Sequence, residues 1–269
     1  MSEYKFCVLG SGSSGNCSIL KLQSGWIMID CGFSLKQTKQ RLKVHGLTLL
    51  NLQDIFLTHL DRDHFNPAWC KTIKIHGIRV HMHERHVPRA KNHGLSIENI
   101  VPFKEEVTLG CTHVEIVQVE HDALGTMSFI FDNGEQRLGF ATDLGHVPPK
   151  LIERFANLDI VAFESNYDPS MQLASNRPEF LKDRIMGGGG HLSNGQTCEA
   201  VKQIASQSPL THIVLLHLSR QCNEPRLIRE LFETQVPHLV PKLTVSSQDQ
   251  PTGMLRVGSE LLETQTALF

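Results

Sequence analysis

The stretch His59-Leu60-Asp61-Arg62-Asp63-His64 decides the fold, because it places four potential metal ligands within six residues. It directly follows Asp54 to Thr58, a short apolar run that is typical of a buried strand. A tight loop at a strand end can turn such side chains toward one point, and imidazole with carboxylate suits Zn, Mn or Fe better than Ca or Mg. The alternative interpretation of these residues is a solvated, charged loop.

Other predicted strands also end in residues of the metal-ligand type. Because the ends of neighbouring strands meet at one edge of a sheet, we expect these side chains to converge with the first group. This convergence favours a metal site over a solvated loop. The segments are Val119-Glu120-His121-Asp122, Ala141-Thr142-Asp143 and Leu215-Leu216-His217.

Strands and helices alternate along the chain and predict a layered α/β domain, with two sheets inside and helices outside. Ser34 and Ser193 have the spacing of helix N-caps, and a hairpin turn is expected at Asp132-Asn133-Gly134. We expect a polar loop from Ser165 to Gly190. The expected strands include Tyr4 to Leu9, Cys17 to Leu22, Trp26 to Asp30, Arg79 to His83, Thr112 to Glu120, Leu158 to Phe163, Thr211 to Leu216 and, as the last, Lys242 to Ser246.

Length and composition exclude several classes of protein. With 40% hydrophobic and 20% charged residues, the 269-residue chain is neither disordered nor fibrous. No apolar run approaches the ~18 residues that span a bilayer, and the first residues lack signal-peptide features, so we expect a cytoplasmic protein without a membrane partner. A net charge of -2 gives no global field for nucleic acid, so an anionic substrate has to be recruited locally.

The seven cysteines and most of the fifteen histidines do not form recognisable sites. The cysteines are scattered without a CxxC pair, so neither a disulfide framework nor a thiolate zinc site is expected. His81 and His83 share one face of a predicted strand, and His86 follows on another element. We interpret these three histidines as packing or surface residues rather than as a further metal site.

The order of the ligand motifs resembles that of the metallo-β-lactamase-fold hydrolase family, which has an HxHxDH motif, a later His, a later Asp and a final His. The resemblance spans residue 4 to about 220 and includes Asp30 as the aspartate of the family's first motif. Three further segments look like the YycJ/WalJ-type branch, which is regarded as nuclease-like. They are Gly10 to Asn16, Glu164 to Asp168 and Gly190 to Asn194.

The resemblance implies a four-layer αββα sandwich, in which two mixed sheets are flanked by helices, and a single domain over residues 1–269. Nucleases with similar Glu164 and His191 segments insert a whole β-CASP domain between them. Here only a short stretch separates these two residues, so we expect no inserted domain.

The resemblance also implies two divalent metal ions and their ligands. His59, Asp61 and His121 would hold one ion, and Asp63, His64 and His217 the other, with Asp143 bridging them. Two cations ~3.5–4 Å apart can share a hydroxide and orient a phosphate oxygen. Asp30 and Glu164 are expected behind the ligands, where Asp30 would set the tautomer of a ligand histidine.

Asp61 departs from the family pattern, because it stands where the family usually has histidine. A carboxylate adds negative charge and shifts the preference toward harder ions such as Mn or Fe rather than Zn. It should also make bound water less acidic than at a neutral three-histidine zinc site. Alternatively, this site is weak or empty, so metal identity and occupancy stay open.

A phosphate-binding region is expected around His191. This residue lies just before the helix that Ser193 caps, where free N–H groups and the helix dipole favour an anion. Lys182 and Arg184, on the same stretch, are candidate phosphate contacts. The alternatives are a flexible glycine loop for Gly187 to Gly190 and a solvated charged face for the two cations.

These expectations combine into a metal-dependent hydrolase that cleaves phosphodiester bonds and is a nuclease, with Asp63, Asp143 and His191 as catalytic residues. A bridging hydroxide would attack phosphorus, and His191 would steady a phosphate oxygen or the leaving group. The substrate would be nucleic acid or a small phosphodiester, and a homo-oligomer is an option. Two rivals remain: a thioester or lactone hydrolase of the same fold, and a non-catalytic regulatory protein with a degenerate metal site.

Overall fold

The computed structural model describes residues 4–121 and 123–257, and its strands form two mixed sheets. In the first sheet the order is β14-β1-β2-β3-β4-β5-β6. The strands from β14 to β3 pair antiparallel, and those from β3 to β6 pair parallel. Their bounds are β1 Lys5–Gly10, β2 Cys17–Leu22, β3 Gly25–Ile29, β4 Leu52–Phe56, β5 Arg79–His83, β6 Ile100–Phe103 and β14 Leu255–Arg256.

The second sheet repeats this mixed arrangement in the order β13-β12-β11-β10-β9-β8-β7. The strands from β7 to β10 pair antiparallel, and those from β10 to β13 pair parallel. Their bounds are β7 Glu106–Leu109, β8 Thr112–Val119, β9 Thr126–Asp132, β10 Arg137–Ala141, β11 Ile160–Glu164, β12 His212–Leu216 and β13 Leu243–Val245.

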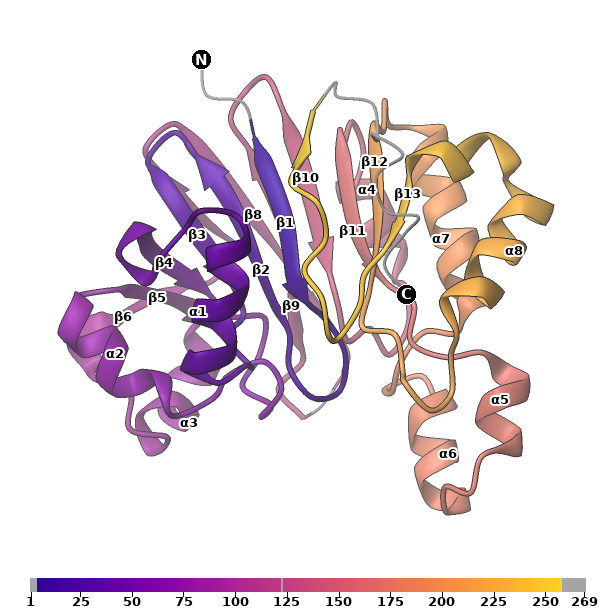
Figure 1. Ribbon diagram of the computed structural model, residues 1–269, viewed down its shortest axis with the longest axis horizontal. Coiled ribbons are helices and arrows are strands. Elements are labelled where there is room, and N and C mark those ends of the chain that lie inside the picture. The colour runs from indigo at the N-terminus through magenta and orange to yellow at the C-terminus, as the bar shows by residue number, and fades with distance from the viewer. Residues whose placement is uncertain (1–3, 122, 258–269) are drawn as a thin grey trace.

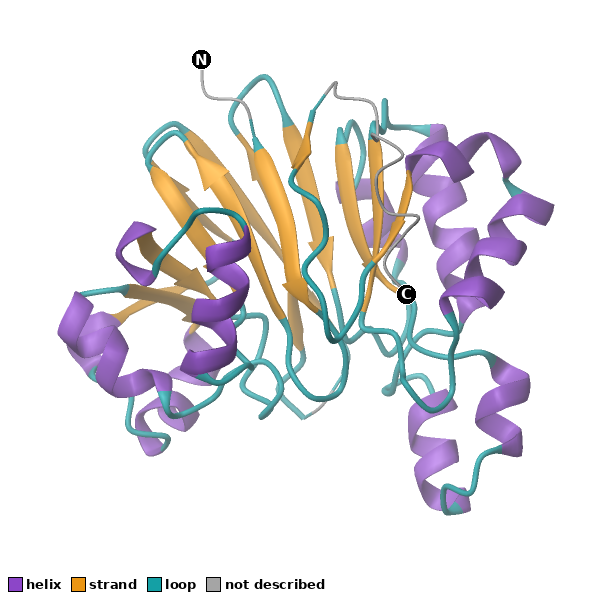
Figure 2. Ribbon diagram, in the orientation of Figure 1, coloured by secondary structure: helices purple, strands orange, loops and turns teal. Residues whose placement is uncertain are grey.

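Helices cover the outer faces of both sheets, which completes the four layers (Figures 1 and 2). The first sheet carries α1 Leu35–Val44, α2 Trp69–His76 and α3 Val87–Asn92. The second carries α4 Pro149–Arg154, α7 Asn194–Ser206 and α8 Pro225–Gln235. Two short helices, α5 Pro169–Ala174 and α6 Glu179–Met186, project from the body of the molecule (Figure 1). Short 3₁₀ segments are Leu49–Asn51, Glu84–His86, Ile97–Asn99 and Pro237–Lys242.

Alternation along the strands divides the apolar side chains between three cores. In β1, Phe6 faces the space between the sheets, whereas Cys7 faces the helices. Between the sheets, Phe56 of β4 meets Phe129 and Phe131 of β9, with ring centroids 5.5 and 5.4 Å apart. Both sheets therefore share the middle core, and this fixes where the strand ends of one sheet lie relative to those of the other.

The predicted α/β sandwich is confirmed, and so are several local signals. Ser34 and Ser193 each form a capping box at the start of α1 and α7. The turn at Asn133-Gly134 joins β9 to β10, as expected. No helix in the described parts of the chain is long and apolar enough to cross a membrane.

The expected polar loop from Ser165 to Gly190 is wrong, because this segment contains α5 and α6. The prediction was based on the polar composition of the segment, but the segment also contains signals that start a helix. The Asp168 side chain accepts a hydrogen bond from the Met171 N–H, and Pro169 occupies the first helical turn. Three short strands, β6, β7 and β14, were also not predicted, so Lys242 to Ser246 is not the last strand.

A backbone ladder anchors the loop His59–His64 against the start of the chain. Asn16 N–H donates to the Asp63 carbonyl at 2.7 Å, Cys31 N–H to the His64 carbonyl at 2.7 Å, and Gly32 N–H to the Asn16 carbonyl at 3.0 Å. A Cβ atom on Gly32 would collide with the Asp63 carbonyl oxygen. Only glycine therefore allows the two segments to approach this closely.

We predict that Gly32→Ala displaces the loop His59–His64 and destabilises the protein by about 1–3 kcal/mol, the usual cost of overpacking. Thermal unfolding followed by circular dichroism measures this loss. Gly195→Ala is the control, because no atom lies within 4 Å of the added methyl position. Equal melting temperatures for both variants would contradict the prediction.

Candidate metal centre

The candidate site lies where strands of both sheets end. Asp30 follows β3, Asp143 comes two residues after β10, and His217 follows β12. All three have a left-handed backbone, with φ of 60°, 53° and 56°. This conformation is costly for residues other than glycine and clusters at functional sites. At each of these strand ends the backbone turns sharply.

The structure brings His59, Asp61 and His121 together as one group of possible metal ligands. One ligand atom from each lies within 4.8 Å of the others. His59 Nε2 is 3.9 Å from Asp61 Oδ2. His121 Nδ1 donates to the Gly190 carbonyl at 3.0 Å, which leaves Nε2 of this ring available to a ligand. Asp122, the next residue, lies outside the described residues.

Asp63, His64 and His217 form the second group, again with ligand atoms within 4.8 Å of one another. Asp143 touches this group from both sides. Its Oδ2 is 2.7 Å from His64 Nε2, and its Oδ1 is 2.8 Å from His217 Nδ1. A third group joins Asp143 to His59 and His64. Asp143 therefore lies between the two groups.

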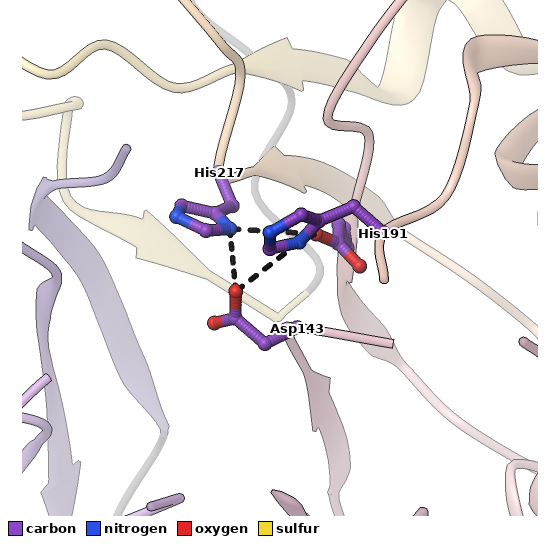
Figure 3. Close-up of side chains that lie close together, drawn as sticks. Asp143, His191 and His217 are labelled. Atoms are coloured by element: carbon purple, nitrogen blue, oxygen red, sulfur yellow. Dashed lines mark hydrogen bonds and ion pairs between the residues drawn. The ribbon is translucent and has the colours of Figure 1, made fainter. Parts of the chain in front are cut away.

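His191 approaches the same carboxylate from the start of α7. Asp143, His191 and His217 point toward one another in Figure 3. His191 Nδ1 is 3.3 Å from Asp143 Oδ1 and 2.7 Å from Glu164 Oε1. Glu164 is fully buried at the end of β11, and its other oxygen accepts from the Leu144 N–H. Glu164 thus links the His191 ring to the loop that carries Asp143.

Buried polar groups hold His64 from behind. Its Nδ1 donates to Asp30 Oδ2 at 2.7 Å, while the Thr58 backbone N–H and hydroxyl donate to the same carboxylate. The side-chain amide nitrogen of Asn16 lies 2.9 Å from His64 Nε2. Asp30 therefore fixes the ring so that Nε2 faces Asp143.

Burial and neighbouring charge shift the pKa values across this cluster. Burial and the nearby His64 lower the pKa of His59 well below its usual range, so this ring is neutral and keeps a lone pair. For His64, burial lowers the pKa, but Asp143 and Asp30 outweigh it and the net pKa lies well above the usual range. Asp143 raises the pKa of His217 in the same way, against the effect of burial.

The donor set fits divalent cations. Nε2 of His217 is buried without a hydrogen bond, 3.4 Å from Asp63 Oδ2. The raised pKa values of His64 and His217 favour their protonated forms beside the carboxylates of Asp63 and Asp143, and a bound cation would replace those protons. Imidazole and carboxylate together suit Zn, Mn or Fe.

The site opens into a cavity of about 250 Å³. Its lining includes Ser13, the predicted ligands apart from His64, and three residues of α6: Leu181, Arg184 and Ile185. A larger groove of about 860 Å³ runs between α4 and α7, but its lining contains Glu153 and Glu199 instead of the ligand cluster. The smaller cavity is therefore the candidate site, because the possible metal ligands line it.

The structure brings only some of the predicted phosphate contacts to this cavity. Arg184 and His191 line it. The Lys182 ammonium instead binds the Leu173 carbonyl of α5 at 2.8 Å and Glu179 of α6 at 3.0 Å, so it links these two helices. The Ser193 hydroxyl is engaged in the capping box of α7. Neither Lys182 nor Ser193 lines the cavity.

Other histidines lie outside the cluster, as the packing interpretation predicts. His81 stacks on Phe56 with centroids 4.5 Å apart and binds Asp54 at 2.7 Å. Asp54 also receives a bidentate Arg79, at 2.7 and 2.8 Å. None of the groups of possible ligands in the described ranges includes His81, His83 or His86.

Sequence reasoning missed several residues of the site. Thr58 and Asn16 contact His64, Ser13 lines the cavity, and Arg89 binds Asp61 at 3.0 Å. The segment Gly10 to Asn16 is recognisable as a motif, but the sequence does not indicate which of its side chains reach the site. No sequence signal connects Arg89 to Asp61, because 28 residues separate them.

A two-sheet sandwich with this ligand cluster at its strand ends defines a metallohydrolase of the β-lactamase type. The chain belongs to the β-lactamase superfamily, since the pattern of the β-lactamase superfamily domain matches residues 25–217. The match covers most of the site, from Asp30 to His217. Membership of this family implies divalent metal ions at the His/Asp cluster.

Curated relatives cover most of the chain. The exodeoxyribonuclease YycJ of Bacillus anthracis is 27% identical over 234 residues, which are 83% of this chain and 86% of the relative. The exodeoxyribonuclease WalJ of Streptococcus pneumoniae serotype 2 is 27% identical over 245 residues, which are 88% of this chain and 90% of the relative.

Solved structures share the fold at low sequence identity. The metallo-β-lactamase-fold protein YhfI of Bacillus subtilis has a TM-score of 0.69 and 12% identity, over 93% of this chain and 100% of its own. The short form of human tRNase Z has a TM-score of 0.62 and 13% identity, over 93% of this chain and 99% of its own. These likenesses confirm the fold.

We predict that Asp30→Asn lowers the affinity of the site for divalent cations by about 10–100-fold, the scale for residues that orient a ligand histidine. The amide lacks the charge that supports the His64 N–H. Competition with a chromophoric chelator measures the affinity. Asp159→Asn is the matched control, because Asp159 binds the Arg137 N–H at the start of β10, at the other end of the strand from Asp143. Equal affinities for both variants would contradict this role of Asp30.

Proposed function

We propose that the protein is a nuclease that hydrolyses phosphodiester bonds of DNA from an end. The observation that carries this proposal is Asp143, which lies between two groups of metal ligands and beside the His191–Glu164 pair. The names of the two exodeoxyribonuclease relatives support DNA as the polymer and an end as the point of attack.

The proposed centre takes two divalent ions of Zn, Mn or Fe. His59, Asp61 and His121 would hold one, Asp63, His64 and His217 the other, and Asp143 would contact both. When bound, the ions supply positive charge for phosphate oxygens and lower the pKa of water.

The protein's own side chains would then orient the substrate. Glu164 engages Nδ1 of His191, which leaves Nε2 of the ring for a phosphate oxygen or the leaving group. Arg184 lines the cavity and would bind a non-reacting phosphate through its planar guanidinium. Asp63 and Asp143, which both lie beside His217, would bind the ions next to the reacting phosphate.

The arrangement favours phosphodiesters over the neutral esters of the rival interpretation. A neutral thioester or lactone has no charged group away from its reacting carbonyl for a cationic side chain to bind. A DNA strand, by contrast, carries further phosphates next to the reacting one. Arg184 and His191 both border the cavity and fit that additional charge. A degenerate, non-catalytic centre fits less well, because all seven predicted ligands belong to the groups described above.

We also propose that residues 1–269 act as a single domain. The shared core between the sheets supports this, as does the short α5–α6 insertion in place of a further domain.

We predict that the manganese-loaded protein releases mononucleotides from linear single- or double-stranded DNA but leaves covalently closed circular DNA intact. An end-dependent enzyme needs a terminus to enter the cavity. Gel analysis of end-labelled DNA, beside RNA, bis-p-nitrophenyl phosphate, a thioester and a lactone, measures the preference. Nicking of circular DNA would overturn the exonuclease proposal. Faster turnover of the thioester or lactone would overturn the nuclease proposal in favour of an ester hydrolase.

We predict that Asp143→Asn and His64→Ala each reduce cleavage by about 100-fold or more, the scale for removing a central electrostatic group. Excess EDTA should have the same effect on the unsubstituted protein. His113→Ala is the control, since His113 is half exposed and pairs only weakly with Glu106, at 3.6 Å. Circular dichroism checks that each variant is folded. Retained cleavage by both site variants would contradict the assignment of Asp143 and His64 to the active site.

A further inference from the structure

We propose that Arg89 is a positioning residue of the metal centre, which holds one oxygen of Asp61 so that the other oxygen can bind a cation together with His59 and His121. This inference rests on the metal-binding part of the proposed function. It accounts for a carboxylate at a position where the family usually has histidine.

The fold brings Arg89 to this place through neighbouring strands. β5 pairs parallel to β4, and the chain continues from β5 through a 3₁₀ turn into α3, which carries Arg89. The end of β4 leads into the loop His59–His64. Phe65 directly follows that loop, and His93 follows the last residue of α3. Their ring centroids are 6.2 Å apart. The helix and the loop therefore pack together.

The two oxygens of Asp61 face different partners. Oδ1 accepts from the Arg89 guanidinium at 3.0 Å, whereas Oδ2 faces His59 Nε2 at 3.9 Å. Two ligands with bonds of about 2.1 Å to one cation lie at most about 4.2 Å apart. Oδ2 and His59 Nε2 are thus close enough to share a cation, while Oδ1 is engaged by Arg89.

Arg89 and Asp61 form an ion pair whose charges offset each other. A histidine ligand is neutral, whereas Asp61 adds one negative charge to the site, and the permanently charged guanidinium offsets it. The side chains of Arg89 and Asp61 are 39% and 33% exposed, so water screens the pair and its contribution to folding is small. The orientation of Oδ2 is therefore its main effect. With histidine at position 61, Arg89 would have no carboxylate to orient at that position.

A double-mutant cycle on metal binding tests this unit without any substrate. The variants are Arg89→Ala, Asp61→His and the combination of both, and calorimetric titration with Mn²⁺ and Zn²⁺ reports stoichiometry and affinity. We expect Arg89→Ala to weaken one ion by about 10–100-fold when Asp61 is present. In the Asp61→His background the same change should alter affinity less than about 3-fold, because position 61 then has no carboxylate for Arg89 to orient.

Two further variants separate positioning from simple charge. Lys91→Ala removes an exposed cation from the same helix and should leave both affinities unchanged. Arg89→Lys keeps the charge but loses the planar guanidinium, so it should recover only part of the affinity. Thermal melting checks that all variants are folded. Equal effects of Arg89→Ala in both backgrounds, or no effect in either, would overturn the role of Arg89 alone, whereas absence of any divalent-cation binding would overturn the metal centre as well.

Discussion

The contacts of the buried Asp143 carboxylate are the interaction on which the rest of the site depends. Asp143 is only 2% exposed, and a buried carboxylate is costly unless charged partners and hydrogen bonds compensate it. One partner, His64, lies in the loop after β4 of the first sheet, and the other, His217, directly follows β12 of the second sheet. The site therefore exists only when both sheets are packed, because the shared core sets the distance between their strand ends.

The backbone at these strand ends is held in a conformation that the residues do not favour by themselves. Asp30, Asp143 and His217 are all left-handed, at a cost of order 1–3 kcal/mol each. Their side chains are locked in return: Asp30 by Thr58 and His64, and Asp143 by His64 and His217. These contacts restrict the carboxylates of Asp30 and Asp143, and this rigidity keeps the ligand atoms in place for a cation.

The surroundings of the cluster differ on its two sides. On one side α6 adds Leu181, Ile185 and Arg184 to the cavity wall, a mostly apolar surface with a single cation. On the other side α3 supplies Arg89 to Asp61. In the chain, α6 lies between Glu164 and His191, and it borders the cavity beside His191. Both features border the candidate metal centre, within a fold that solved structures share at 12–13% identity.

The sequence by itself determined the fold class, the candidate ligands that the structure brings together and the order of the main elements. It could do so because ligands within six residues at a strand end, capping boxes and strand alternation are local patterns, and a tight loop or a helix start needs only its neighbours in the chain. It did not reveal α5 and α6, whose start signals lie in a polar stretch, nor the short edge strands β6, β7 and β14. Only the tertiary structure decided that Arg89 binds Asp61, that Asn16 and Thr58 hold His64, and that Lys182 faces away from the cavity. Strand pairing and the packing of helices and loops around the site bring these residues into contact. Local sequence patterns do not predict such contacts.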